Sequence, residues 1–253
     1  MYNLKSKDEN SKITIKQINE AENFWQNLFP DIIEEIKLPT IKNKKSISKY
    51  GIYEFSIKRK ESQKIELLSR KDPYFAYSLF IAIYDILFFL LSGQKNIING
   101  IPSDFKETNK VNISNIPYIV LPVYVLESFS LQYILSTVRE TLTKCYYYQY
   151  YSIAKIKKML NIDDKVNLRR FMIVTKDIYG TSCINQFLNA ENDLSVNICF
   201  DNIIKIQTRF DIGLFDESII IQLSKYIQFL VEKFLHNGLT KISDITLPSD
   251  ISK

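Results

Sequence analysis

The sequence predicts a fold of the α/β (α+β) class, in which helices pack against one mixed β-sheet. Segments with helical and with strand-like periodicity follow each other without a strict strand–helix–strand repeat, so a purely parallel sheet is not expected. Hydrophobic residues make up 46% of the 253 residues, with only 6 glycines and 7 prolines. We therefore expect one large lobe over residues 46–253, preceded by a helix and a basic connector in residues 1–45.

The first helix is predicted just after Thr14. Thr14 and Gln17 have the spacing of a capping box, and the apolar residues Phe24 and Leu28 fall on one helical face behind them. A proline cannot continue a helix, because it donates no backbone hydrogen bond and its ring clashes with the preceding turn. We therefore expect Pro30 to end this helix.

A connector, a strand and a second helix are expected next. Residues 36–49 indicate an extended basic connector, and the lysine-rich stretch at 42–45 is interpreted as a solvated loop. Apolar and polar residues alternate over residues 51–57, which predicts a strand. The charged, amphipathic residues 63–71 predict a helix.

The most apolar stretch of the chain, residues 74–91, predicts a fully buried helix. Asp72 suits the N-cap, Pro73 suits the first helical turn, and Gly93 suits the C-cap. The stretch approaches the length of a membrane span, but Asp85 lies in its middle and would be costly in lipid. A core helix is therefore preferred, and no membrane partner is expected.

A short strand and a turn are predicted after this helix. Residues 95–100 favour a strand, and Gly100 and Pro102 predict a turn directly behind it. A polar loop is expected over residues 103–116. The strand predicted over residues 117–125 contains a proline, so we expect it at an edge of the sheet or at a bulge.

The second half of the chain predicts further helices and strands. A long helix should begin after Ser128, and a final amphipathic helix should begin after Asp216 and end before Gly238. The turn at Asp201 and Asn202 would join two strands as a hairpin. A short helix is expected at residues 152–160, and strands are expected at residues 169–177, 192–200 and 202–211.

Charge and cysteine content argue against several classes of protein. The net charge of +5 is spread along the chain, and no zinc-finger or RNA-binding motif occurs, so no nucleic-acid partner is expected. The three cysteines are widely spaced, which argues against a disulfide framework or a zinc site and favours the cytoplasm. No secretory signal is visible at the N-terminus. Neither a metal nor a cofactor is expected.

No catalytic constellation is visible. His236, the only histidine, is expected at the end of a helix in a structural role. Cys145 is interpreted as a buried core thiol rather than a nucleophile, and Asp163 and Asp164 as solvated turn residues. The nucleophile-elbow, phosphate-loop and zinc-protease motifs are absent. We therefore do not expect the chain to be an enzyme by itself.

Five tyrosines gather between residues 146 and 151. At helical spacing they cover every face of a helix, so some rings must be exposed or must contact a partner. Packing within the lobe and a protein–protein contact both explain them. Tyr147 and Tyr150 are taken as interface candidates.

The motifs, in this order and spacing, resemble the C-terminal half of the condensation domain of nonribosomal peptide synthetases. "FWQNLF" and "EIKLPT" resemble the Trp-containing helix and connector of that family, with Ile41 in place of its usual aspartate. "GQKNIINGIPS" resembles the family's turn and strand behind the buried helix, and "RFDIGLFDESIIIQL" resembles its closing segment. The resemblance runs from about Ile15 to Ser249. It implies a chloramphenicol-acetyltransferase-like mixed sheet forming a single half-condensation lobe.

The resemblance also implies what the chain does. The family's His-His-x-x-x-Asp-Gly motif belongs to the N-terminal lobe and is absent from this sequence. The leading hypothesis is a catalytically inactive partial condensation domain that serves as a structural or docking element beside an adenylation domain or an acidic carrier protein. One alternative is half of a split enzyme whose His-bearing lobe is on another chain. A second alternative is a module that binds carrier proteins or peptides.

By resemblance, contact with a missing lobe or a carrier is expected in two segments. One is the turn between Gly93 and Gly100, and the other is the family's floor loop, here residues 103–116. The interface candidates in and beside these segments are Gly93, Gly100, Pro102, Ser103 and Asn115.

Overall fold

The computed structural model describes residues 14–29, 33–40, 49–103, 118–188 and 192–249. Within them, one sheet of six strands runs in the order β1-β6-β5-β4-β2-β3. Strands β2, β4 and β5 are parallel to one another, and the other neighbours are antiparallel. The strands are β1 (Tyr50–Ser56), β2 (Asn96–Pro102), β3 (Tyr118–Tyr124), β4 (Phe171–Thr175), β5 (Leu194–Phe200) and β6 (Ile204–Asp211).

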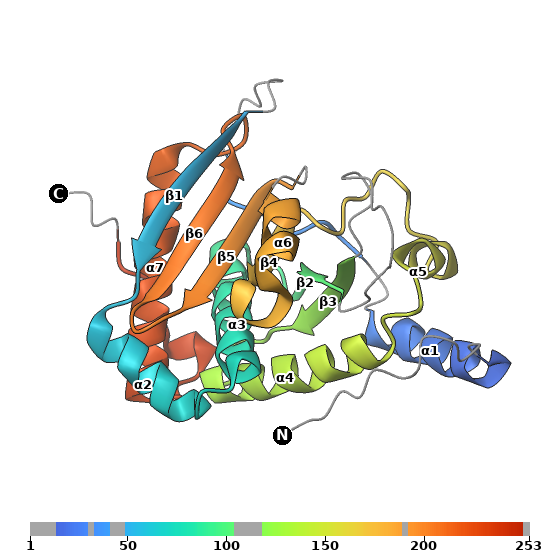
Figure 1. The fold of residues 1–253 in the computed structure, drawn as a ribbon, viewed down its shortest axis with the longest axis horizontal. Helices are drawn as coiled ribbons and strands as arrows, with labels where there is room; N and C mark the ends of the chain where they lie inside the picture. The colour runs from blue at the N-terminus through green and yellow to red at the C-terminus, as the bar shows by residue number, and fades with distance from the viewer. Residues whose placement is uncertain (1–13, 30–32, 41–48, 104–117, 189–191, 250–253) are drawn as a thin grey trace.

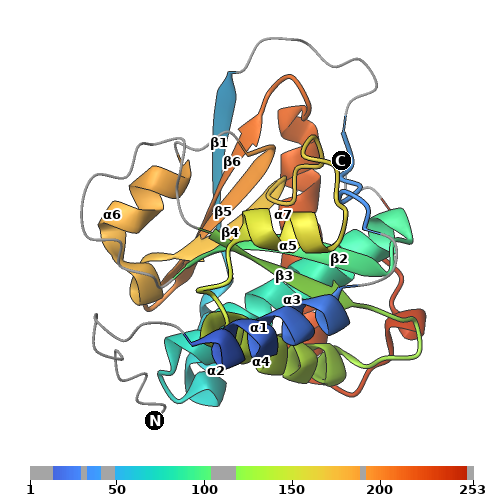
Figure 2. The same cartoon turned by 90° about the vertical axis from the view of Figure 1, so that its right-hand side faces the viewer.

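Helices cover both faces of this sheet. Figure 1 shows α6 in front of β4 and β5, with α7 behind β1 and β6. In Figure 2 the sheet lies between α6 on one side and α3 and α7 on the other. The α-helices are α1 (Ile15–Leu28), α2 (Arg59–Ser69), α3 (Pro73–Ser92), α4 (Leu131–Tyr147), α5 (Ile153–Met159), α6 (Lys176–Leu188) and α7 (Glu217–His236).

Helix α3 is the centre of the core, and its predicted ends are confirmed. The Asp72 side chain accepts a hydrogen bond from the Tyr74 backbone at 3.0 Å, and Pro73 occupies the first turn. Gly93 closes the helix with φ of +69°, a conformation that glycine adopts without strain. The helix is long and apolar enough to cross a membrane, but 78% of that stretch is buried within the fold.

The predicted hairpin and the predicted edge strand also agree with the structure. Strands β5 and β6 pair antiparallel across the turn at Asp201 and Asn202. Strand β3 is an edge strand, and Pro122 lies opposite Ile98 of β2. The edge position explains why a residue without a backbone N–H is accepted there.

Several predicted boundaries were wrong. Helix α2 begins at Arg59 rather than at residue 63, because its first turn includes exposed charged residues that extend the helix without an apolar face. Ser130, not Ser128, caps α4, since its hydroxyl accepts a hydrogen bond from the Tyr133 backbone at 3.1 Å. Asp216 occupies the N-cap position of α7, but its side chain makes no capping hydrogen bond.

One helix and one strand extension were not predicted. Helix α6 was missed because Gly180, at φ of +77°, interrupts its helical pattern. The predicted turn at Gly100 was also wrong, because β2 continues through Gly100 to Pro102. Gly100 lies between Val120 and Met172, and a Cβ atom there would come within 1.9 Å of the Met172 sulfur.

Candidate functional site

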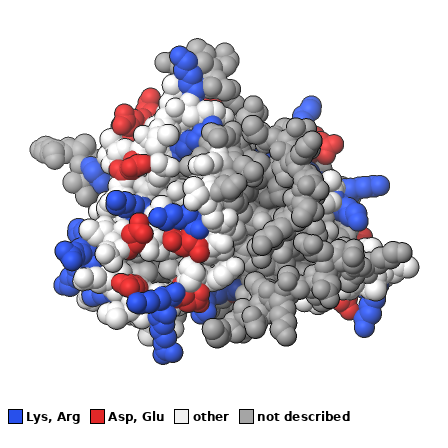
Figure 3. Space-filling view, viewed as in Figure 1, with Lys and Arg blue, Asp and Glu red and all other residues white. Residues whose placement is uncertain are grey.

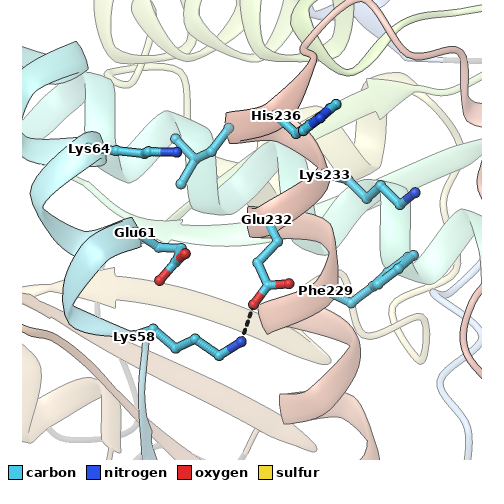
Figure 4. A pocket seen from close by; sticks show the side chains of 8 residues that line it. Lys58, Glu61, Lys64, Phe229, Glu232, Lys233 and His236 are labelled. Atoms are coloured by element: carbon cyan, nitrogen blue, oxygen red, sulfur yellow. Dashed lines mark hydrogen bonds and ion pairs between the residues drawn. The ribbon is translucent and has the colours of Figure 1, made fainter.

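The only histidine borders an open hollow of about 510 Å³ between α2 and α7 (Figure 4). His236 is the last residue of α7, and its side chain is exposed. Within the part of the chain that the structure describes, no hydrogen bond orients its imidazole. The hollow is lined by Lys58, Glu61, Lys64, Phe229, Glu232, Lys233, Leu235 and His236.

The chemistry of this hollow is that of a charged surface. Lys58 forms an ion pair with Glu232, and this hydrogen bond and charge raise the pKa of Lys58. The Lys233 ammonium lies 5.3 Å from the centre of the Phe229 ring. A general base needs a substrate cleft and a partner that fixes its orientation, and His236 has neither among the described residues. The end of a helix instead favours a basic side chain by its dipole.

Cys145 and Cys199 are not activated nucleophiles. Cys145 is fully buried in α4, and burial raises the pKa of its thiol, as expected for a core residue. Cys199 in β5 is half-buried. Burial raises the pKa of Cys199 as well, although the nearby Lys176 charge opposes this effect. Neither sulfur is held as a thiolate near neutral pH.

A second hollow, of about 680 Å³, lies on the opposite side of α2 and is lined partly by carboxylates. Asp72 is used as the cap of α3. Asp177 accepts hydrogen bonds from the Thr175 hydroxyl at 3.1 Å and from the Phe200 backbone at 2.9 Å. Asp201 pairs with Lys176 at 3.5 Å. Asp72, Asp177 and Asp201 therefore hold chain segments together, and the fourth carboxylate of the hollow, Glu66, is exposed on α2.

A buried carboxyl lies in the core between α3 and β2. Asp85 Oδ1 accepts a hydrogen bond from the Asn99 amide at 2.6 Å, and both side chains are fully buried. Burial raises the pKa of the Asp85 carboxyl well above its usual range, and the bond from Asn99 opposes this only in part. Asp85 Oδ2 and Asn99 Oδ1 have no other partner. The buried carboxyl therefore favours its neutral form, in a place that no substrate reaches.

The predicted interface candidates between residues 93 and 103 include both surface and interior positions. Gly93 lies at the end of α3, with open space where a Cβ would be. Gly100 and Pro102 are buried inside β2, and Ser103 follows them half-buried. Asn115 lies outside the described residues. The role of these residues in an interface stays a prediction.

Tyrosines of the run at residues 146–151 pack α1 against the rest of the lobe. The Trp25 indole donates a hydrogen bond to the Tyr148 carbonyl at 3.3 Å, and Phe24 stacks on the Tyr148 ring with centroids 4.6 Å apart. The Tyr150 hydroxyl donates to the Gln17 carbonyl at 2.9 Å. These contacts lie within the chain, and Tyr147 is the large exposed ring of the run. An interface role for Tyr147 and Tyr150 stays a prediction.

A polar network that the sequence did not reveal holds the connector after α1. Arg170 contacts Asp193 at 2.5 Å and Glu35 at 3.3 Å. Gln94 accepts a hydrogen bond from the Lys37 backbone at 2.9 Å and donates one to the Glu35 carbonyl at 3.1 Å. These partners are far apart in the chain, so no local motif could have predicted the network.

The outer face of β1 and β6 is polar. Glu54 accepts a hydrogen bond from Gln207 across the two strands, with Lys205 exposed on the same face. Ile52 is the exposed large apolar side chain of β1. Figure 3 shows positive and negative side chains mixed over the side of the molecule where β1 and β6 lie. This face has the character of a solvated surface rather than of an apolar interface.

The comparisons with known proteins agree with the fold. A profile of the condensation-domain family matches residues 6–253. The chain belongs to the condensation-domain family. No curated protein sequence matches it. The profile match confirms the predicted family. Together with the sheet and helices described above, it also confirms the predicted chloramphenicol-acetyltransferase-like fold.

Solved structures show the same fold at low sequence identity. A four-domain nonribosomal peptide synthetase bound to AMP and glycine aligns with a TM-score of 0.74 and 12% identity, over 94% of this chain and 21% of that chain. The X-domain from teicoplanin biosynthesis, in complex with OxyB, aligns with a TM-score of 0.73 and 14% identity, over 92% and 56%. The first condensation domain of the calcium-dependent antibiotic synthetase gives 0.66 and 10%, over 92% and 55%.

This condensation-type chain therefore spans little more than half of the second and third of these structures and about a fifth of the first. At such identities the likeness concerns the fold alone. The site that the chain itself contributes must be judged from its own residues, which offer charged surfaces and no assembled catalytic centre among those described.

Proposed function

We propose that this chain is the C-terminal lobe of a nonribosomal peptide synthetase condensation domain and acts as a catalytically silent docking element. Its partner would be an adenylation domain, an acidic carrier protein or a His-bearing condensation lobe. The observation that carries the proposal is His236, the only histidine, which stands exposed at a helix end without a partner to orient it in the described structure.

The chemistry of amide formation supports silence. An amine that attacks a thioester must lose a proton, and a base held in a closed site assists that step. Cys145 and Asp85 are buried in the core, and Asp72, Asp177 and Asp201 around the second hollow are engaged by the chain itself. Glu66 also lines that hollow, but it is exposed on α2 and no closed site surrounds it.

A docking role is supported by the fold. The teicoplanin X-domain contains this fold and was solved in complex with OxyB, which supports a protein-binding role for a domain of this kind. The split-enzyme hypothesis predicts an exposed apolar face toward the missing lobe. The exposed large apolar residues of the described surface are instead spread over α1, α2, α3, α4, β1, β3 and several loops, and the outer face of β1 and β6 is polar.

The test is an amide-bond assay with a thioester donor and an acceptor amine. The purified chain alone should give no product above the uncatalysed rate. Turnover that disappears in His236→Ala would contradict silence. Mixing the chain with a separately produced His-bearing lobe tests the split enzyme: activity that requires both polypeptides would establish it in place of the silent docking element.

A further inference from the structure

Helix α2 carries an exposed stripe in which two leucines lie among lysines. Leu67 is 77% exposed and Leu68 is 53% exposed, although both are large apolar side chains. At 100° per residue they share one side of the helix with the exposed lysines, opposite the buried residues Ser62, Ile65 and Ser69. We call Lys60, Lys64, Leu67 and Leu68 of α2, together with Lys71 just beyond the helix end at Ser69, the α2 stripe.

The lysines of the α2 stripe belong to a chain segment with a net positive charge. Residues 58–72 contain six Lys and Arg against three Asp and Glu, a surplus of three positive charges when the whole chain has five. Within the described residues, none of Lys60, Lys64 and Lys71 has an ion-pair partner. Their charges are therefore available to an external carboxylate.

The shape beside the stripe also fits a partner. The 510 Å³ hollow runs along α2, with Lys64 on one side and Lys233 of α7 on the other (Figure 4). The Lys58–Glu232 pair occupies its far end, and Glu61 also lines it, so an incoming acidic side chain would contact Lys64 and Lys233 at its open side. The exposed leucines continue the same helix beyond Lys64.

We propose that the α2 stripe is a docking surface for an acidic helix that presents leucine-type side chains between its carboxylates. Charge complementarity selects the partner: its carboxylates face the lysines while its apolar side chains cover Leu67 and Leu68. This inference specifies which surface would carry the proposed docking function, and it rests on that proposed function. A lipid surface is less favoured, because α2 has only 11 residues and Glu61 and Glu66 interrupt its positive charge.

The test uses the full chain and a synthetic helical peptide that alternates glutamate and leucine along one face. Binding is measured by calorimetric titration at low and at physiological salt. The peptide should bind, and salt should weaken binding because it screens exposed charges. Lys60→Glu with Lys64→Glu should weaken binding on the order of tenfold, and Leu67→Ser with Leu68→Ser should do the same.

Lys158→Glu with Lys165→Glu is the matched control, since it makes the same change of net charge on exposed lysines in and after α5. This control should bind the peptide within about twofold of the unchanged chain, because surface charges far from a contact contribute little. A peptide in which glutamine replaces glutamate should bind more weakly.

Three outcomes would overturn the proposal. The first is that the peptide does not bind, and the second is that the α2 variants bind it as well as the control does. The third is that vesicles of phosphatidylcholine and phosphatidylserine bind through the stripe while the peptide does not. Each leaves the amide-bond assay unaffected, so loss of this surface is distinguishable from failure of the silent-lobe proposal.

Discussion

Helices α2 and α3 are neighbours in the chain and opposites in character. Helix α3 buries 14 of its 20 residues, including Asp85, whereas α2 buries only Ser62, Ile65 and Ser69 and leaves two leucines in solvent. Changes inside α3 should therefore affect folding, and changes on α2 should affect binding alone. The difference shows that buried apolar residues stabilise the fold, whereas exposed apolar residues are available to bind a partner.

The largest expected effect is on the buried helix. Phe88 is fully buried and packs edge-on against Phe171 of β4, with ring centroids 4.8 Å apart. Phe88→Ala should lower the free energy of unfolding by about 3–5 kcal/mol, since it removes apolar contacts and leaves a cavity. Urea denaturation followed by circular dichroism measures this. A loss below 1 kcal/mol, about that of a surface change, would contradict the burial of α3.

The second-largest effect on stability is expected at the buried carboxyl of Asp85. The pKa of Asp85 is raised in the folded state, so folding takes up a proton and stability is lost as pH rises above the unfolded value of about 4. Asp85→Asn keeps an oxygen that can accept the hydrogen bond from the Asn99 amide and carries no charge, so it should stabilise the fold by about 1–3 kcal/mol near neutral pH.

The measurement for Asp85 is the difference in unfolding free energy between the unchanged chain and Asp85→Asn at several pH values from 5 to 8. This difference should grow with pH by at most about 1.4 kcal/mol per pH unit. A difference that stays constant with pH would mean that Asp85 is ionised in the folded core.

A smaller effect is expected at the boundary between the two helices. Asp72→Ala removes the hydrogen bond that caps α3 and should cost about 1 kcal/mol of stability. Asp216→Ala is the control, because Asp216 holds the same position on α7 without a capping hydrogen bond. Equal losses in thermal unfolding of the two variants would show that the capping bond contributes nothing.

The smallest effect on stability is expected on α2. Leu67→Ser and Leu68→Ser should each change the free energy of unfolding by less than about 0.5 kcal/mol, because both side chains are already exposed. Urea denaturation again measures this. A loss of about 2 kcal/mol would show that the leucines are covered, and the distinction between the two helices would fail.

Sequence patterns predicted α3 well because its limits are local. Asp72, Pro73 and Gly93 act on the adjacent backbone, so their meaning does not depend on distant residues. Gly100 was misplaced because its role comes from Met172 and Val120, which reach it only in the assembled sheet. A glycine that avoids a clash and a glycine that makes a turn look the same in a sequence.

The sequence reveals the composition of the candidate site more readily than its arrangement. A single histidine is visible in the composition and already argues against the family's catalytic motif. The α2 stripe was missed because Leu67 and Leu68 resemble core residues until the packing of Ile65 fixes which side of the helix faces inward. The same limit hid the pairing of Arg170 with Glu35.

The claim that this lobe is a binding platform is tested most directly by hydrogen exchange across the whole chain, with and without the acidic helical peptide. Slower exchange over residues 59–69, with residues 73–92 equally protected in both states, is the result that we predict. Unchanged exchange in α2 at saturating peptide, or protection elsewhere instead, would contradict it.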